Sequence, residues 1–221
     1  MTSVLGIAQN EITVNKGGLY VLPNTIISTH FDFNNEASGV VFNDGEFQFY
    51  KNYTNEGMFT HTNNLTTGYT VFQGNNPQII AGSQPSKHFD LLFNNRSTDY
   101  SFQLNNDFIV DGNANFLNGI VKINPNQEGA LLFTENGKHT NTSDASYAEG
   151  MVEKIGNKPF VFPVGKGTYN RAAAIGAPKT LADSFKTEYL LEDTNVNYPI
   201  ENRTGVIRLV DDKGFWIITR N

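Results

Sequence analysis

The chain has 221 residues, no cysteine and a formal net charge of −6, from 16 basic and 22 acidic residues. Without cysteine it cannot form disulfides, thiolate nucleophiles or cysteine-ligated zinc sites. The acidic balance, with no run of lysine or arginine, disfavours nucleic acid and anionic membranes as partners. No apolar run approaches the roughly 18–20 residues of a bilayer-spanning helix, so we expect a chain that does not span a membrane.

Residues 1–11 have the character of a leader. Val4 to Gln9 resembles the end of a secretory signal peptide, although the segment lacks a basic start and its apolar stretch is short. We interpret residues 1–11 as a leader or as the remnant of a trimmed signal peptide, with an ordinary first strand as the alternative. A leader predicts export from the cell.

Residues 12–140 contain short runs in which apolar and polar residues alternate, a pattern typical of β-strands. Turn sequences rich in Asn and Gly separate the runs, and helical periodicity is absent. The predicted strands include 12–14, 40–42, 47–50, 69–72 and 101–104, and the predicted turns are 43–45, 55–57, 73–76 and 111–113.

An aromatic residue followed by Asn-Asn, or by a similar pair, recurs in this region at steps of about 20 residues. Its members are Phe33, Tyr53 and Phe93, with Phe72 as a member slipped by one residue. This period suits one coil of a β-solenoid. In a β-sandwich, there is no reason for the same residue types to recur at a fixed interval. We therefore predict an all-β fold with a right-handed parallel β-helix over 12–140. Phe33, Tyr53 and Phe93 should form one column, and Asn side chains should form hydrogen-bonded ladders.

Residues 141–221 differ in pattern, and the polar segment 139–144 marks the boundary. Gly176 and Pro178 would end a helix over the Ala-rich segment 171–177 after less than two turns, so we predict a strand there. Together with the apolar runs 160–165, 184–191 and 215–219, this predicts a small antiparallel β block. The chain ends directly after the last run, so we expect the block to be truncated from a longer protein.

Two segments of this block resemble a known family. Residues 147–154 read YAEGMVEK, and residues 160–169 read FVFPVGKGTY. Both are similar to the head region of Bacteroidetes surface proteins exported by the type IX secretion system, particularly gliding-motility-associated cargo. Residues 184–189 and the pair Phe215-Trp216 match later strands of that family, whereas Asn170-Arg171 departs from its usual Tyr-Arg.

The resemblance implies a secreted protein on the outer face of the outer membrane, with adhesion more common than a known reaction. It also implies partners in the type IX secretion machinery or an outer-membrane protein, reached through regions absent from this sequence. We therefore expect a non-enzymatic, adhesin-like cell-surface module. A structural or accessory component that assembles with an outer-membrane partner is an alternative.

Solenoid faces rich in Tyr, Asn and Thr could bind glycans or surfaces weakly and repeatedly. For each tyrosine, stacking inside the core is the competing interpretation. The candidate binding residues are Tyr50, Tyr53, Tyr69 and Tyr100.

One oxygen-rich segment is a candidate calcium site, because calcium takes six to eight oxygen ligands. The alternative is an Asx-turn at a corner of the solenoid. No other cofactor is expected. The candidate ligands are Asp107, Asp111, Asn113 and Asn115.

The enzymatic alternative is a polysaccharide-active β-helix enzyme, either a lyase or a hydrolase. Glu36 and Glu56 hold equivalent positions one coil apart, at a separation of about 5 Å that suits a retaining carboxylate pair. Ser86, His88 and Asp90 alternate as if on one face of a strand. Neighbours on such a face are about 6.5–7 Å apart, which is too far for a nucleophile and its base.

Overall fold

The computed structural model describes residues 11–97, 100–124, 130–202, 204–205 and 211–221. The fold is nearly all β, with about six turns of a β-solenoid built from parallel sheets and some small antiparallel sheets. The prediction of a parallel β-solenoid followed by antiparallel strands is therefore confirmed. The predicted leader lies, except for Glu11, outside the described residues.

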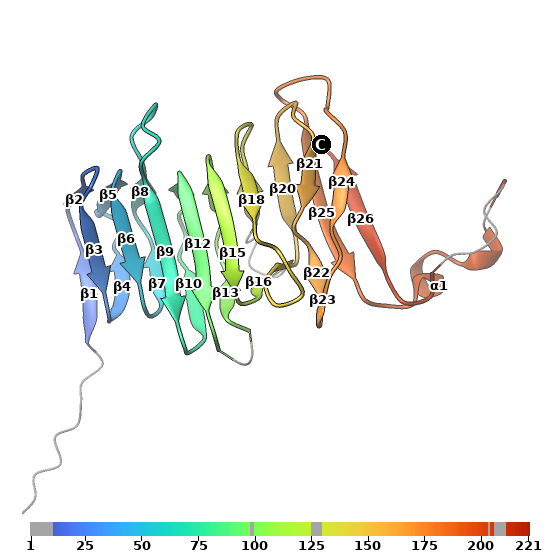
Figure 1. The fold of residues 1–221 in the computed structure, drawn as a ribbon, viewed down its shortest axis with the longest axis horizontal. Coiled ribbons are helices and arrows are strands. Elements are labelled where there is room, and N and C mark those ends of the chain that lie inside the picture. Colours follow the sequence, from blue (N-terminus) through green and yellow to red (C-terminus); the bar gives the residue numbers. More distant parts are fainter. Residues whose placement is uncertain (1–10, 98–99, 125–129, 203, 206–210) are drawn as a thin grey trace, which may run out of the picture.

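Each full turn of the solenoid contributes one strand to each of three sheets, named here A, B and C (Figure 1). Sheet A contains β1 (Ile12–Asn15), β4 (Asp32–Asn35), β7 (Tyr53–Asn55), β10 (Gln78–Ala81), β13 (Phe102–Leu104), β16 (Val121–Ile123) and β19 (Ala148–Glu149). The parallel part of sheet B contains β2 (Gly18–Val21), β5 (Val40–Asn43), β8 (Met58–Thr60), β11 (Ser86–His88), β14 (Phe108–Val110), β17 (Leu131–Phe133) and β20 (Val152–Ile155). Sheet C contains β3 (Ile26–Thr29), β6 (Glu46–Phe49), β9 (Tyr69–Gly74), β12 (Asp90–Asn95), β15 (Asn113–Asn118) and β18 (Lys138–Thr140).

Aromatic side chains fill the interior, because alternate residues of every strand point inward and in-register parallel strands stack like on like. In sheet C, the ring of Phe72 lies 5.1 Å from that of Phe49 and 6.4 Å from that of Phe93. Phe93 in turn lies 5.4 Å from Phe116. All four side chains are fully buried, and burial of each contributes roughly 2–3 kcal/mol.

One predicted column is wrong. Phe33 and Tyr53 do pair in sheet A, with stacked rings 5.9 Å apart. Phe93, however, belongs to sheet C, where it pairs with Phe72. The step from Phe33 to Tyr53 is 20 residues, but Tyr53 pairs next with Ile80, 27 residues on, because a longer loop follows β8. The repeat is therefore out of phase beyond this loop.

The predicted amide ladder is confirmed at the start of sheet A. Asn15 Nδ2 donates to Asn35 Oδ1 at 2.8 Å, and Asn35 Nδ2 donates to Asn55 Oδ1 at 2.7 Å. Asn35 and Asn55 are completely buried. Asn95, predicted to share this pattern, ends β12 and instead donates to Gln78 Oε1 at 3.1 Å.

Parallel pairing continues beyond the predicted boundary at residue 140. β19 pairs with β16 and β20 pairs with β17, both in parallel, so a last partial turn reaches Ile155. Sheet B then continues with antiparallel strands β25 (Ser184–Leu190) and β26 (Phe215–Arg220). The remaining elements are the strand pairs β21 (Phe160–Phe162) with β24 (Ala173–Ile175) and β22 (Gly165–Lys166) with β23 (Tyr169–Asn170), the helix α1 (Thr194–Asn197) and the 3₁₀ turn Ile200–Asn202.

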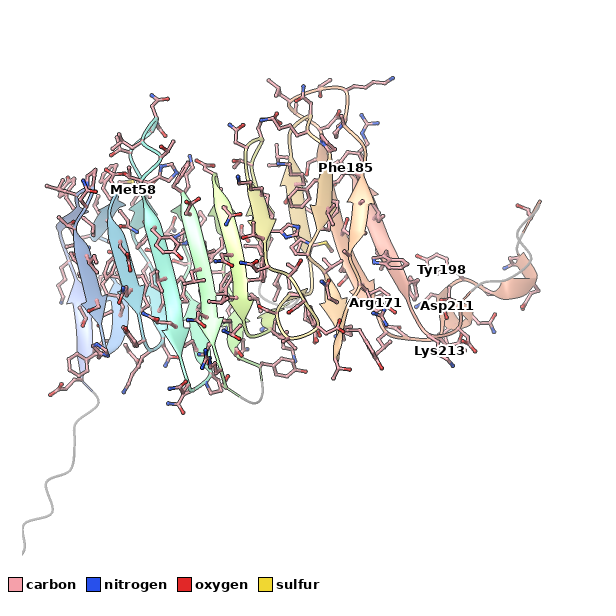
Figure 2. All side chains as sticks on the ribbon, in the orientation of Figure 1. Met58, Arg171, Phe185, Tyr198, Asp211 and Lys213 are labelled. Atoms are coloured by element: carbon pink, nitrogen blue, oxygen red, sulfur yellow. The ribbon has the colours of Figure 1, made fainter. Side chains whose placement is uncertain are left out.

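The solenoid and the antiparallel strands form one continuous row, because β25 adds directly to β20. Figure 2 shows Met58 in the N-terminal half of this row, with Arg171 and Phe185 on the antiparallel block. No helix in the described parts of the chain is long and apolar enough to cross a membrane.

Candidate functional site: a groove at one corner of the solenoid

A groove of about 860 Å³ lies where the outer faces of sheets B and C meet. This volume is within the range of small-molecule sites. One wall is the loop 61–67 between β8 and β9, which rises above the strand ends in Figure 1. The groove, called here the corner groove, is lined by His61, Asn63, Asn64, Leu65, Thr66, Phe89, Asp90, Asp111, Gly112, Asn113, Thr134, Asn136 and Lys138.

The loop is held to the solenoid by a buried carboxylate. Asp44 accepts hydrogen bonds from Thr62 N and Thr62 Oγ1, both at 2.7 Å. Its backbone oxygen accepts from Thr67 Oγ1 at 2.6 Å. Asn64 has a φ of 70°, in the left-handed region that Asn tolerates at a turn. The wall of the groove is therefore preformed.

Asp111 lies at the base of the loop and is surrounded by donors. His61 Nε2 and Lys87 Nζ contact Asp111 Oδ2 at 3.0 and 2.8 Å, and Thr134 Oγ1 donates to Oδ1 at 2.8 Å. Burial raises the pKa of this carboxyl, but these hydrogen bonds and the charge of Lys87 outweigh burial and hold the pKa well below its usual range. Asp111 is therefore a fixed anion.

The pKa of Asp90, at the start of β12, shifts in the opposite direction. Burial raises its pKa, although the hydrogen bond from Asn113 N at 2.6 Å and the charge of Lys138 act against that shift. The groove thus contains two carboxyl groups whose pKa values move apart. Phe89 lies beside them, with its ring centroid 5.7 Å from that of His61.

The predicted tyrosines fall into three environments. Tyr53 was predicted as a surface candidate, and this is wrong: its side chain is completely buried, with its hydroxyl 2.8 Å from Ser86 Oγ. Tyr50 and Tyr69 lie half-buried on the outer side of sheet C. Tyr100 is 45% exposed before β13, with Lys122 Nζ 3.9 Å from its ring centroid.

The predicted calcium ligands do not form one cluster. The strand β14 separates Asp107 from Asp111, and Asp107 Oδ1 accepts from Ala130 N at 2.9 Å. Asn113 lies in the corner groove, whereas Asn115 Oδ1 accepts from Asn141 Nδ2 at 2.8 Å on the outer side of sheet C. Across the described ranges, no three His, Cys, Asp or Glu residues are grouped so as to hold a metal ion.

Glu36 and Glu56 occupy equivalent positions in successive turns, since each follows a residue of the Asn35–Asn55 pair. Both already have partners. Glu36 Oε1 lies 3.3 Å from Lys16 Nζ, and Glu56 Oε2 accepts from Ser83 N at 3.1 Å. These contacts tie neighbouring coils together.

Ser86, His88 and Asp90 do not share a strand. Ser86 and His88 belong to β11 and are buried in the core, whereas Asp90 begins β12 on the next sheet. Their interpretation as one polar face is therefore wrong, because the chain turns a corner at Phe89.

No family model, curated protein or solved structure matches this chain. The groove itself therefore carries the evidence for function. Sequence reasoning found Asp111 and Asn113 but missed Asn64, Phe89 and Thr134. The Asn-rich break in the strand pattern near residues 61–67 could have indicated Asn64, whereas no sequence signal marks Phe89 or Thr134.

Proposed function

We propose that the protein is a non-enzymatic, adhesin-like module that binds glycans in the corner groove. The observation that carries the proposal is the lining of this groove, in which amides, hydroxyls and carboxylates surround Phe89 against a preformed loop. Sugars present many hydroxyl groups beside apolar C–H faces. A fixed set of polar groups next to an aromatic ring complements both.

The charge of the groove favours an uncharged or weakly charged glycan. Lys87 Nζ lies 2.8 Å from Asp111 Oδ2, and the charge of Lys138 acts against the burial that raises the pKa of Asp90, so two cations accompany the two carboxyl groups. With its charges matched, the groove offers a strongly anionic ligand no net attraction. A neutral sugar gains hydrogen bonds to these charged groups, which are stronger than those between neutral partners.

The test is binding to a panel of soluble oligosaccharides, measured by calorimetry for the parent chain and for Phe89→Ala and Asn113→Ala. Each substitution is expected to weaken binding at least tenfold. Gln103→Ala, at an exposed position of β13 on sheet A, is the control and should bind as the parent does. Circular dichroism confirms that each variant is folded. A parent chain that binds no member of the panel would overturn the proposal.

A polysaccharide-active enzyme is the second candidate, favoured by the opposite pKa shifts of Asp90 and Asp111. A carboxyl with a raised pKa suits a general acid, and a fixed carboxylate suits stabilisation of positive charge. This candidate predicts release of reducing ends from a bound glycan, lost in Asp90→Asn while binding persists. A bound glycan that stays intact over days would exclude it.

We also propose export by the type IX secretion system to the cell surface. Support comes from the resemblance of residues 147–154 and 160–169 to heads of such cargo. In a bacterium that has this system, a tagged full-length protein should appear on the cell surface and stay inside when the system is deleted. Capture with an outer-membrane protein, without glycan binding, would favour the accessory role instead.

A further inference from the structure

The outer face of sheet C carries side chains in three parallel rows that run along the solenoid axis. From β6 to β18 the register places one residue of the first row and one of the second on each strand, and the third row has one residue on each of β9, β12 and β15, at the strand spacing of about 4.8 Å. The first row is Glu46, Tyr69, Asp90, Asn113 and Lys138; the second is Gln48, Val71, Leu92, Asn115 and Thr140; the third is Gln73, Asn94 and Asn118, with Tyr50 beside Gln73.

Hydrogen bonds within one coil and between neighbouring coils hold these polar side chains in place. Gln48 Oε1 accepts from Gln73 Nε2 and from the hydroxyl of Tyr50, both at 3.3 Å. Asn118 Nδ2 donates to Asn94 Oδ1 at 2.8 Å. All five side chains belong to half-buried residues, so the face is both ordered and accessible. Such preorganisation lowers the entropy lost when a ligand binds.

The face joins two hollows. The first row runs into the corner groove through Asp90, Asn113 and Lys138. At the other side of the sheet, a shallower hollow of about 260 Å³ is lined by Tyr50, Gln73, Gly74, Asn75, Asn94 and Arg96. Between the two hollows the second row presents the half-buried Leu92 and the buried Val71, so a ligand longer than the corner groove crosses apolar surface before it reaches the amides of the third row.

We infer that sheet C binds an extended, uncharged polysaccharide chain, with its terminal sugars in the corner groove. This inference rests on the proposed glycan-binding function and names the class of glycan. In an extended chain of pyranose rings, each sugar advances by a length close to the spacing of the coils. Successive sugars can thus meet equivalent amides on successive turns, and weak contacts add along the chain.

The side chains of the second and third rows explain the preference for an uncharged polymer. Neither row contains a carboxylate or a cation, and Leu92 offers apolar surface between the amides. The first row contains the carboxyl groups of Glu46 and Asp90 and one cation, Lys138, so its carboxyl groups outnumber its cations and disfavour a polyuronate. Amides exchange hydrogen bonds with neutral hydroxyl groups without such a penalty.

The experiment measures affinity for uncharged β-linked gluco-, xylo- and manno-oligosaccharides from disaccharide to hexasaccharide, with oligogalacturonides as the charged comparison. Affinity for one uncharged series should rise at least tenfold with length. The double variant Gln73→Ala/Asn94→Ala should remove that gain and leave disaccharide affinity unchanged. Gln103→Ala, which makes the same chemical change on sheet A, should behave as the parent does.

The outcomes separate this inference from the proposed function. If disaccharide and hexasaccharide bind equally, or if the double variant keeps the full gain with length, sheet C is not a binding face and only the corner groove remains. Tighter binding of the oligogalacturonides would also overturn the inference. If the parent binds no oligosaccharide at all, the proposed function fails, and this inference fails with it. Thermal melting of each variant shows that a lost gain does not come from unfolding.

Discussion

Acid should destabilise this protein through one buried histidine. His88 in β11 is 1% exposed, with its ring centroid 4.5 Å from that of Phe108 and 5.0 Å from that of Phe59. Its Nδ1 lies 2.9 Å from Thr70 Oγ1, but its Nε2 has no hydrogen-bond partner among the residues that the structure describes. A charged imidazole at this place would be surrounded by aromatic rings, so the folded protein keeps it neutral.

The magnitude follows from the pKa of His88. Burial, together with the charge of His61, lowers this pKa from 6.5 to about 3. Because the unfolded chain binds the proton more tightly, stability that is fully present above pH 6.5 is lost as the pH falls towards 3. At pH 4 the expected loss is roughly 3 kcal/mol, at about 1.4 kcal/mol for each pKa unit.

The assay is urea unfolding at several pH values between 7 and 4, for the parent and for His88→Leu. Protonation of carboxylates affects both chains, so the difference between the two profiles isolates the histidine. The free energy of unfolding of the variant should fall by roughly 3 kcal/mol less than that of the parent between pH 7 and 4. Exposed His30 supplies the control, and His30→Leu should follow the parent. Parallel profiles for the parent and His88→Leu would refute the reasoning.

Three further predictions concern stability and metal dependence. Asn35→Ala should lower the free energy of unfolding by about 2–3 kcal/mol in urea, because it leaves the amides on either side of the ladder without their partner. Lys154→Met should lower the free energy of unfolding by a similar ~2–3 kcal/mol. The reason is that Lys154 Nζ donates to the backbone oxygens of Thr134, Glu135 and Gly137 at 2.5–3.1 Å. Lys158→Met, at a more exposed lysine, is the control. Removing calcium with a chelator should leave the melting temperature and glycan affinity unchanged, and a marked drop in either would restore the calcium hypothesis.

The fold could be predicted because its signal is repeated in every coil. Alternation within each strand determines which residues point inward, and a change in loop length does not alter that inward or outward position. Phe33, Tyr53 and Phe93 are all buried, as a core position requires, even though Phe93 belongs to another sheet. Which residues stack in one column depends instead on the number of residues between strands. A single loop of different length shifts every later column, so the pattern cannot predict it.

The groove that brings Asp111 and Asn113 together escaped prediction for the same reason. The link between β5 and β6 is the pair Asp44-Gly45, whereas the link between β8 and β9 spans residues 61–68. The added residues cannot enter the core without leaving their backbone groups unpaired, so they project outward and are anchored by Asp44. The irregular turn thus both breaks the repeat and builds the wall of the groove. In a solenoid, the residues that fit the repeat maintain the scaffold, and a search for function should begin where the repeat fails.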